Sequence, residues 1–212
     1  EARLVMSEDQ LRVVTGETSR GIGIDSIFDV VRDVSLGADA DSTETVTLAF
    51  AAGSRRKTVS IRTDAETLVR FQRLAYAQLL SDAEVAVERR QTGHGTDGEP
   101  TYRLRVSADR IRLMPTDGGS PIVVRRTDIT RFDTPSETNA PSVVLYSSAD
   151  RVGRIGIRLP SFRLLNLFGR YLRADLLTVD ALGSDGVDDD SIEVLLVDDD
   201  RYDRDLTAVF LS

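Results

Sequence analysis

The sequence predicts an α+β protein, mainly β, in which two similar small barrels or sandwiches follow one another and each ends in a helix. Short runs of alternating apolar and polar residues, typical of half-buried strands, fill both halves of the chain. A longer apolar stripe with helical spacing closes each half. The first pattern returns about 100 residues later, and a repeat of this length is a domain, not a solenoid unit.

In the first copy we expect a series of strands and then one helix. The strands are Ala2–Met6, Gln10–Thr15, Gly21–Ile24, Val30–Val34, Thr45–Ala51 and Thr58–Arg62. The helix begins at a capping box, Thr63 with Glu66, which satisfies backbone N–H groups at the helix start. Its apolar stripe consists of Leu68, Phe71, Ala75 and Leu79.

The second copy repeats these elements. Residues 2–14 match 102–114 at a shift of 100, and residues 58–80 match 154–177 at a shift of 97, which pairs Phe71 with Phe168. Its helix is expected after Pro160, where a missing N–H costs nothing, with a stripe of Leu164, Phe168, Tyr171 and Leu172.

One strand of the second copy, residues 83–91 before the loop 92–100, has no counterpart after Glu1. We therefore expect the natural protein to extend further at its N-terminus, and domain 1 to lack its first strand here. The predicted divisions are domain 1 at 1–81, domain 2 at 82–180, an acidic linker at 181–191 and a terminal segment at 192–212.

The charge pattern indicates a salt-rich cytoplasm. There are 25 Asp and 10 Glu residues against 26 Arg and one lysine, Lys57, for a net charge of −8. Salt screens carboxylate repulsion, so this composition predicts a halophilic, archaeal, cytoplasmic protein. A high-GC genome would explain the arginines but not the acids. The negative charge argues against nucleic acid as a partner, the apolar runs are too short to span a membrane, and the absence of cysteine excludes disulfides and thiolate metal sites.

Two stretches of the first copy resemble a known fold. RLVMSEDQLRVV (3–14) followed by IDSIFDVVRDVS (24–35) is similar to the start of PH-like and GRAM-like domains. Two such units in tandem in a lysine-poor chain resemble the archaeal taxis adaptor family CheF, over roughly residues 2–177. The resemblance implies a non-enzymatic adaptor with protein partners, which links the chemotaxis response regulator to the archaellum motor.

The terminal segment resembles the start of a response-regulator receiver domain. In IEVLLVDDD (192–200) an apolar run suits a central parallel strand, and acids follow its carboxyl end. The resemblance implies that Asp199 ligates Mg²⁺ directly and that Asp198 neighbours it, in a receiver that is truncated before its acceptor aspartate. We therefore expect no cofactor in these residues and Mg²⁺ only in a complete receiver. The alternative is a strand that pairs with a PH-like sheet, followed by a solvated acidic helix.

Enzymatic chemistry is not indicated. Residues 93–98 match G-x-G-x-x-G, but a strand follows them where a dinucleotide site needs a helix. His94, the only histidine, lies in this glycine-rich loop, so no Ser–His–Asp set is predicted.

Arginine clusters are the candidate partner-binding residues. Arg55, Arg56 and Lys57 form the strongest basic cluster, on an expected hairpin, and Arg125 and Arg126 lie at a strand end. Pairing with nearby acids is the competing interpretation. Two further functions remain open at this point: a response regulator of another two-component pathway with PH-like output domains, and a membrane-surface binding module.

Overall fold

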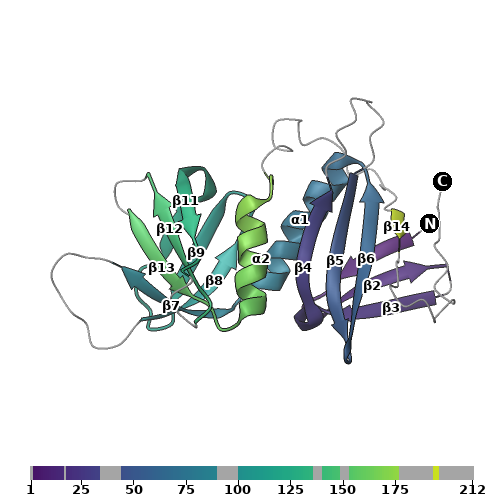
Figure 1. The fold of residues 1–212 in the computed structure, drawn as a ribbon, viewed down its shortest axis with the longest axis horizontal. Coiled ribbons are helices and arrows are strands. Elements are labelled where there is room, and N and C mark those ends of the chain that lie inside the picture. The colour runs from purple at the N-terminus through teal and green to yellow at the C-terminus, as the bar shows by residue number, and fades with distance from the viewer. Residues whose placement is uncertain are drawn as a thin grey trace. The chain divides into compact units, whose positions relative to one another are not determined.

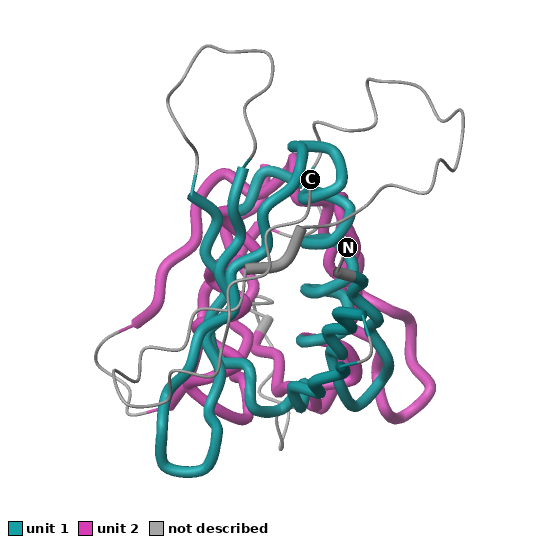
Figure 2. The backbone as a smooth tube through the Cα atoms, turned by 90° about the vertical axis from the view of Figure 1, so that its right-hand side faces the viewer, with its two compact units in different colours: residues 1–79, 174–212 teal, residues 80–173 magenta. Residues whose placement is uncertain are grey.

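The computed structural model describes residues 2–16, 18–33, 44–89, 100–135, 140–148, 153–176 and 193–195. The chain divides into two compact units (Figure 2): unit 1 comprises residues 1–79 and 174–212, and unit 2 comprises residues 80–173. The described residues form β-sheets and two α-helices, so the predicted α+β class, mainly β, is confirmed.

Unit 1 contains two antiparallel sheets and a helix (Figure 1). The first sheet has the order β1-β2-β3, formed by Ala2–Met6, Gln10–Thr15 and Thr18–Gly23. The second has the order β14-β6-β5-β4, formed by Glu193–Leu195, Arg55–Thr63, Glu44–Ala52 and Ile27–Asp33. A 3₁₀ turn, η1 (Ile24–Ser26), joins the sheets, and α1 (Ala65–Leu80) follows β6.

The start of α1 differs from the prediction by one residue. The cap is Asp64, whose carboxylate accepts a hydrogen bond from the Thr67 N–H at 2.9 Å. Thr63 instead donates its hydroxyl to Asp64 at 3.2 Å, and Glu66 pairs with Arg70 at 2.6 Å. The predicted capping box is therefore wrong, because β6 continues through Thr63. The predicted apolar stripe is confirmed, since all four of its side chains are buried (Leu68, Phe71, Ala75 and Leu79).

Unit 2 has one seven-stranded antiparallel sheet with the order β10-β9-β8-β7-β13-β12-β11. In chain order its strands are Glu84–Arg89, Thr101–Val106, Arg110–Pro115, Ile122–Arg125, Ile129–Asp133, Ser142–Ser147 and Arg154–Arg158. The turn η2 (Arg126–Asp128) precedes β11, and α2 (Phe162–Arg173) follows β13. The central strand is β7, which pairs with both β8 and β13 and so joins the two halves of the sheet.

The core of α2 is close to the prediction. Leu164, Phe168 and Tyr171 are buried, as expected. The predicted stripe also included Leu172, which is only half-buried, and it missed Leu167, which is fully buried. The helix is capped by Ser161, whose hydroxyl oxygen accepts a hydrogen bond from the Leu164 N–H at 3.2 Å.

The two units repeat the same local hydrogen bonds. Ser7 donates its hydroxyl to Asp9 at 2.7 Å, and Ser107 donates to Asp109 at 2.8 Å. In both units a β-bulge follows the 3₁₀ turn, between Ile27 and Asp29 in β4 and between Ile129 and Arg131 in β11. Phe71 and Phe168 are both buried and both lie seven residues after their helix caps, Asp64 and Ser161.

The strand β14 is the only part of the terminal segment that the structure describes. It pairs antiparallel with β6, with Val194 opposite Ile61 (Figure 1). A receiver's first strand would be expected in a parallel sheet, so this pairing agrees with the alternative of a strand added to the sheet of the unit. The other residues of the predicted receiver segment, including Asp198 and Asp199 with their predicted Mg²⁺ role, lie outside the described residues.

The ladders among the described strands do not close into a complete barrel in either unit, because β3 and β4 end separate sheets and β10 and β11 are opposite edges of one sheet. Within the same residues, no helix is both long enough and apolar enough to cross a membrane.

Candidate binding surfaces

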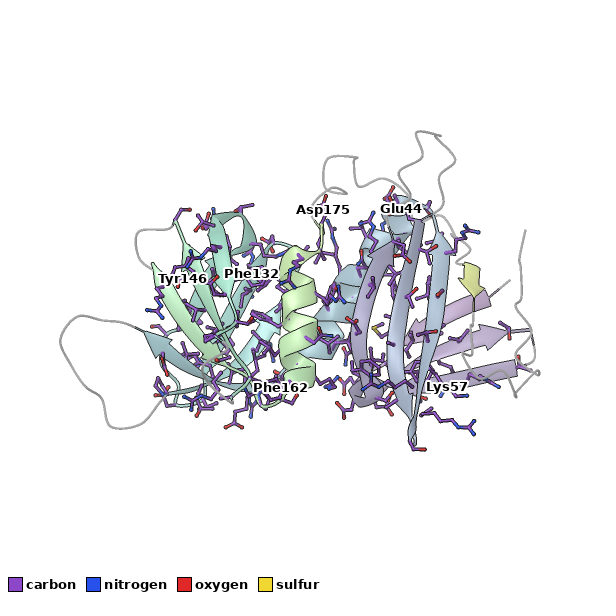
Figure 3. The ribbon with its side chains drawn as sticks, viewed as in Figure 1. Glu44, Lys57, Phe132, Tyr146, Phe162 and Asp175 are labelled. Atoms are coloured by element: carbon purple, nitrogen blue, oxygen red, sulfur yellow. The ribbon has the colours of Figure 1, made fainter. Side chains whose placement is uncertain are left out.

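Unit 2 presents an arginine–tyrosine cluster on three neighbouring strands. We use this name for Arg131 of β11, Tyr146 of β12 and Arg154 of β13, which lie opposite one another across the sheet. The Arg131 guanidinium lies 4.4 Å from the centroid of the Tyr146 ring, and that of Arg154 lies 6.0 Å from it (Figure 3 labels Tyr146). These are cation–π distances. Both arginines are exposed, so the cluster faces solvent.

The electrostatics of this cluster keep Arg131 charged. A hydrogen bond to Tyr146 and the neighbouring Asp133 carboxylate, 2.7 Å away, raise the pKa of the Arg131 guanidinium. The tyrosine and the bridging acid also hold the arginine in one orientation. A preoriented cation beside an aromatic ring is a typical centre of a protein–protein interface, where arginine and tyrosine are enriched.

A further arginine of unit 2, Arg173, contacts the ring of Phe132, the residue that follows Arg131 in the chain. The Arg173 guanidinium lies 4.9 Å from the Phe132 ring centroid, and Arg173 also donates to the Gly169 carbonyl at 3.4 Å (Figure 3 labels Phe132). These contacts tie the last turn of α2 to β11. The ring that Arg173 contacts, Phe132, follows Arg131 in β11.

Arg126, predicted as a partner-binding residue, has a structural role. Its guanidinium donates to the carbonyls of Ala108 and Tyr171, each at 2.9 Å, and lies 4.7 Å from the centroid of the Tyr171 ring. It therefore links the β8–β9 turn to the end of α2. Its neighbour Arg125 is exposed at the end of β10, so the predicted pair separates into one structural and one surface residue.

Tyr171 is the buried partner of Arg126. Its hydroxyl donates to the carbonyl oxygens of Ser107 at 2.8 Å and Arg110 at 3.2 Å. Burial raises the pKa of this tyrosine well above its usual value, so the ring stays neutral. The contacts of Arg126 and Tyr171 together fix the helix to the turn that contains Asp109.

In unit 1 the predicted basic residues form the first part of β6. The basic hairpin, which we define as Arg55, Arg56 and Lys57, follows a turn in which Gly53 has a φ of +63°, a conformation that favours glycine. Arg55 and Arg56 are exposed and Lys57 is half-buried (labelled in Figure 3). The Arg56 guanidinium lies 5.5 Å from the ring centroid of Phe28 in β4. The hairpin thus combines charge with an aromatic ring, as the cluster in unit 2 does.

The sequence did not single out the arginine–tyrosine cluster. Its members lie on three strands and come together only through the register of β11, β12 and β13. Alternation could have indicated only Arg154, which is exposed in β13; the burial of β12 does not alternate around Tyr146, so no pattern singled out the three residues together. In the described part of the chain, no three His, Cys, Asp or Glu side chains are grouped in a way that could hold a metal ion.

The comparisons with known proteins give the family. The model of the archaeal chemotaxis signal transduction system protein F family matches residues 1–175. The chain belongs to this CheF family. The match covers nearly all of the described residues of both units and ends before β14. No curated protein is significantly similar to the chain. Membership of the CheF family makes it a chemotaxis signalling protein, for which protein partners are expected.

Proposed function

We propose that this chain is a non-enzymatic, cytoplasmic adaptor of archaeal taxis, which links a response regulator to the archaellum motor. The observation that carries the proposal is the CheF family match across residues 1–175. An adaptor must bind two partners, and each unit of this chain offers an exposed combination of arginine and an aromatic ring. These are Arg56 with Phe28 in unit 1 and the arginine–tyrosine cluster in unit 2.

We also propose that each unit is a PH-like domain. The seven strands of unit 2, followed by the single helix α2, support this. Unit 1 supports it through the same turn, bulge and helix cap. An experimental structure in which β1–β6 and α1 failed to superpose on β8–β13 and α2 would contradict the assignment.

The arginine–tyrosine cluster is the proposed surface for the response regulator. Receiver domains carry clustered carboxylates around their phosphorylation site, which guanidinium groups complement. Arg131 is held in place by Tyr146 and Asp133, so less side-chain entropy is lost when it binds. The basic hairpin of unit 1, with Arg55, Arg56 and Lys57, is then the proposed surface for the motor component.

The test measures both partners against matched variants. The response regulator from the same genome, with and without beryllofluoride, is titrated against the wild-type chain, Arg131→Ala and Arg112→Ala in molar KCl. Arg112 is an exposed arginine of β9 in the same unit, so both variants lose one charge. Arg131→Ala should weaken binding about tenfold or more, as expected for an interface centre, and Arg112→Ala by much less.

In the second arm, a motor component is titrated against the wild-type chain, Arg56→Ala and the control Arg12→Ala. Arg12 has in β2 the position that Arg112 has in β9. Each arginine variant should affect only its own partner. Loss of both interactions in either variant would contradict the assignment of one partner to each unit. No binding of either partner by the wild-type chain would contradict the adaptor function itself.

A further inference from the structure

The outer face of β8, β9 and β10 in unit 2 is rich in arginine. Burial alternates along these three strands, so every second side chain points away from the core. The register places the outward residues of neighbouring strands opposite one another on one side of the sheet. We call this surface the arginine face and define it by seven residues: Arg103, Arg105, Arg110, Arg112, Met114, Val123 and Arg125.

Two pairs of arginines on this face lie directly opposite each other. Arg105 of β8 is the register partner of Arg112 of β9. Arg110 of β9 is the register partner of Arg125 of β10. Like charges at directly opposed positions destabilise an antiparallel pair. Among the strand pairs that the structure describes, no other opposed residues carry like charges.

The carboxylates around the face neutralise only part of its charge. Asp82 lies 3.2 Å from Arg105, and Asp109 pairs with Arg110. A third acid, Glu84, lies beside the face on β7. Five guanidinium groups thus stand against three carboxylates. The surface has a local excess of positive charge in a chain whose net charge is −8.

The centre of the face has both free charge and apolar area. Arg112 and Arg125 are exposed, and neither forms an ion pair with any residue that the structure describes. Met114 and Val123 lie among the arginines and are 37% and 44% exposed. Arginine and methionine are both enriched in protein–protein interfaces, where a long side chain contributes apolar contact as well as polar groups.

Unit 1 indicates that the fold does not require these arginines. The repeat has the same strands and the same turn there, but uncharged residues at three of the positions: Val5 in place of Arg105, Gln10 in place of Arg110 and Gly23 in place of Arg125. Packing of the sheet therefore does not account for the opposed arginine pairs of unit 2.

Clustered carboxylates are the chemistry that complements this face. A guanidinium group forms two parallel hydrogen bonds with a carboxylate. Opposed residues of the sheet have Cα atoms about 5 Å apart, and alternate residues of one strand are about 7 Å apart. Acids on successive turns of a helix, or at alternate positions of a strand, have similar spacing. A single acidic segment can therefore reach several of the arginines at once.

An extended polyanion fits the face less well. A membrane surface or a nucleic acid interacts with more of the molecule than one face, and the net charge of −8 repels it. Nucleic-acid single strands that bind a sheet also stack on aromatic side chains, and the seven residues of the arginine face include none. A short acidic segment needs only the face itself.

We propose that the arginine face is a docking surface for an acidic segment of a partner protein, whose carboxylates lie against the two opposed arginine pairs. Binding then removes the repulsion within each pair. β7 separates these strands from β11, β12 and β13, which carry the arginine–tyrosine cluster. The inference is therefore independent of the partners proposed above, and Arg112→Ala remains the control for the response regulator.

The test titrates a fluorescent octaglutamate peptide against three forms of the whole chain, with octaglutamine as the neutral peptide. The face variant, Arg105→Val with Arg125→Gln, removes one arginine from each opposed pair and leaves the pair of Arg110 with Asp109 intact. The control variant, Arg20→Val with Arg62→Gln, removes two exposed arginines of unit 1 by the same substitutions. Both variants therefore have the same net charge.

The wild-type chain should bind octaglutamate and not octaglutamine. The face variant should bind octaglutamate about tenfold or more weakly, and the control variant should lose much less. Equal losses in the two variants, or no binding by the wild-type chain, would overturn the proposal. The melting temperature of the face variant should be no lower than that of the control, because like-charge repulsion has been removed. A lower value would assign the arginines to stability instead of binding.

The competing occupants are measured with the same three chains. Phosphatidylglycerol vesicles represent an anionic membrane, and oligothymidine represents a single-stranded nucleic acid. Either should bind the wild-type chain more weakly than octaglutamate does. Tighter binding that the face variant abolishes would overturn the proposal in favour of that polyanion. Sedimentation of the chain alone covers the last case, since self-association abolished only in the face variant would mean that a second copy occupies the face.

Discussion

At the residue scale, Tyr171 and Arg126 each make two hydrogen bonds to main-chain carbonyl oxygens of unit 2. The tyrosine donates to two carbonyls of the β8–β9 turn, while the arginine donates to a carbonyl in that turn and to one in α2. Together these contacts tie the end of α2 to the β8–β9 turn. The sequence predicted Tyr171 as a core residue but assigned Arg126 to partner binding, because the main-chain partners of Arg126 come near it only in the fold.

Tyr171→Phe should lower the free energy of unfolding by about 1–2 kcal/mol, because it removes one donor that serves two carbonyl oxygens. The ring remains, so the apolar contacts and the position of Arg126 should persist. Chemical denaturation followed by circular dichroism measures the change. Tyr102→Phe, on half-exposed β8 in the same unit, is the control. An equal effect of both substitutions would show that the buried hydrogen bonds of Tyr171 are not what stabilises the helix contact.

Asp109 should make stability depend on pH. Hydrogen bonds from Arg110 and then from Ser107 lower the pKa of its carboxyl group from 3.8 to about 2. Since the folded pKa lies below the unfolded one, the stabilisation is present above pH 4 and is lost as pH falls toward 2. Asp109→Asn should therefore reduce the slope of unfolding free energy against pH in this interval. Asp82→Asn removes an exposed carboxylate of the same unit for comparison, and an unchanged slope in Asp109→Asn would contradict the expectation.

At the scale of elements, strands and helices were predicted well where periodicity determines them. β1, β2 and the core face of α1 agree with their alternation and stripe, because burial of one face is a property of the residue pattern itself. Ends were predicted less well. β3 is Thr18–Gly23 where Gly21–Ile24 was expected, and Asp64 replaces Thr63 as the helix cap. Adjacent residues with similar capping chemistry cannot be separated by sequence, since the end of the preceding strand decides between them.

Asp64→Ala tests the observed cap. The Asp64 carboxylate is partly desolvated, which opposes ionisation, but hydrogen bonds from Thr67, Thr63 and Glu66 outweigh this and lower its pKa. Loss of the cap should cost about 1 kcal/mol of unfolding free energy. Glu66→Ala, which removes the acid of the predicted capping box and its exposed pair with Arg70, should cost about 0.5 kcal/mol or less. Thermal denaturation of both variants ranks the two effects, and the reverse order would restore the predicted box.

At the scale of the whole molecule, the repeat was the most predictive feature of the sequence. The matches of Ser7 with Ser107 and of Phe71 with Phe168 predicted shared turns and helix positions, and the structure has both. Contacts between segments far apart in the chain could not be predicted in this way. The pairing of β14 with β6 joins residues more than a hundred positions apart. The sequence predicted a receiver segment, with a strand added to a PH-like sheet as the alternative, but could not give the strand's partner.

Salt should stabilise the whole chain. The sequence holds 35 acidic residues and a net charge of −8, and self-repulsion of this kind weakens a compact state unless it is screened. The melting temperature should rise between about 0.1 M and about 3 M KCl. Sodium sulfate at matched ionic strength separates screening from effects on apolar hydration. A melting temperature that is equal or lower in concentrated KCl would contradict the interpretation of a halophilic protein.

The repeated bulges have a consequence for solubility at high protein concentration. Each lies on the outermost strand of its sheet, β4 in one unit and β11 in the other. A bulge breaks the even spacing of N–H and C=O groups along part of an edge, so a neighbouring molecule's strand can form only a shorter ladder with it. Edge-to-edge stacking into fibrous aggregates is thereby opposed at β4 and β11. In a crowded cell, these two edges of the described sheets are therefore poor templates for pairing with a neighbouring molecule.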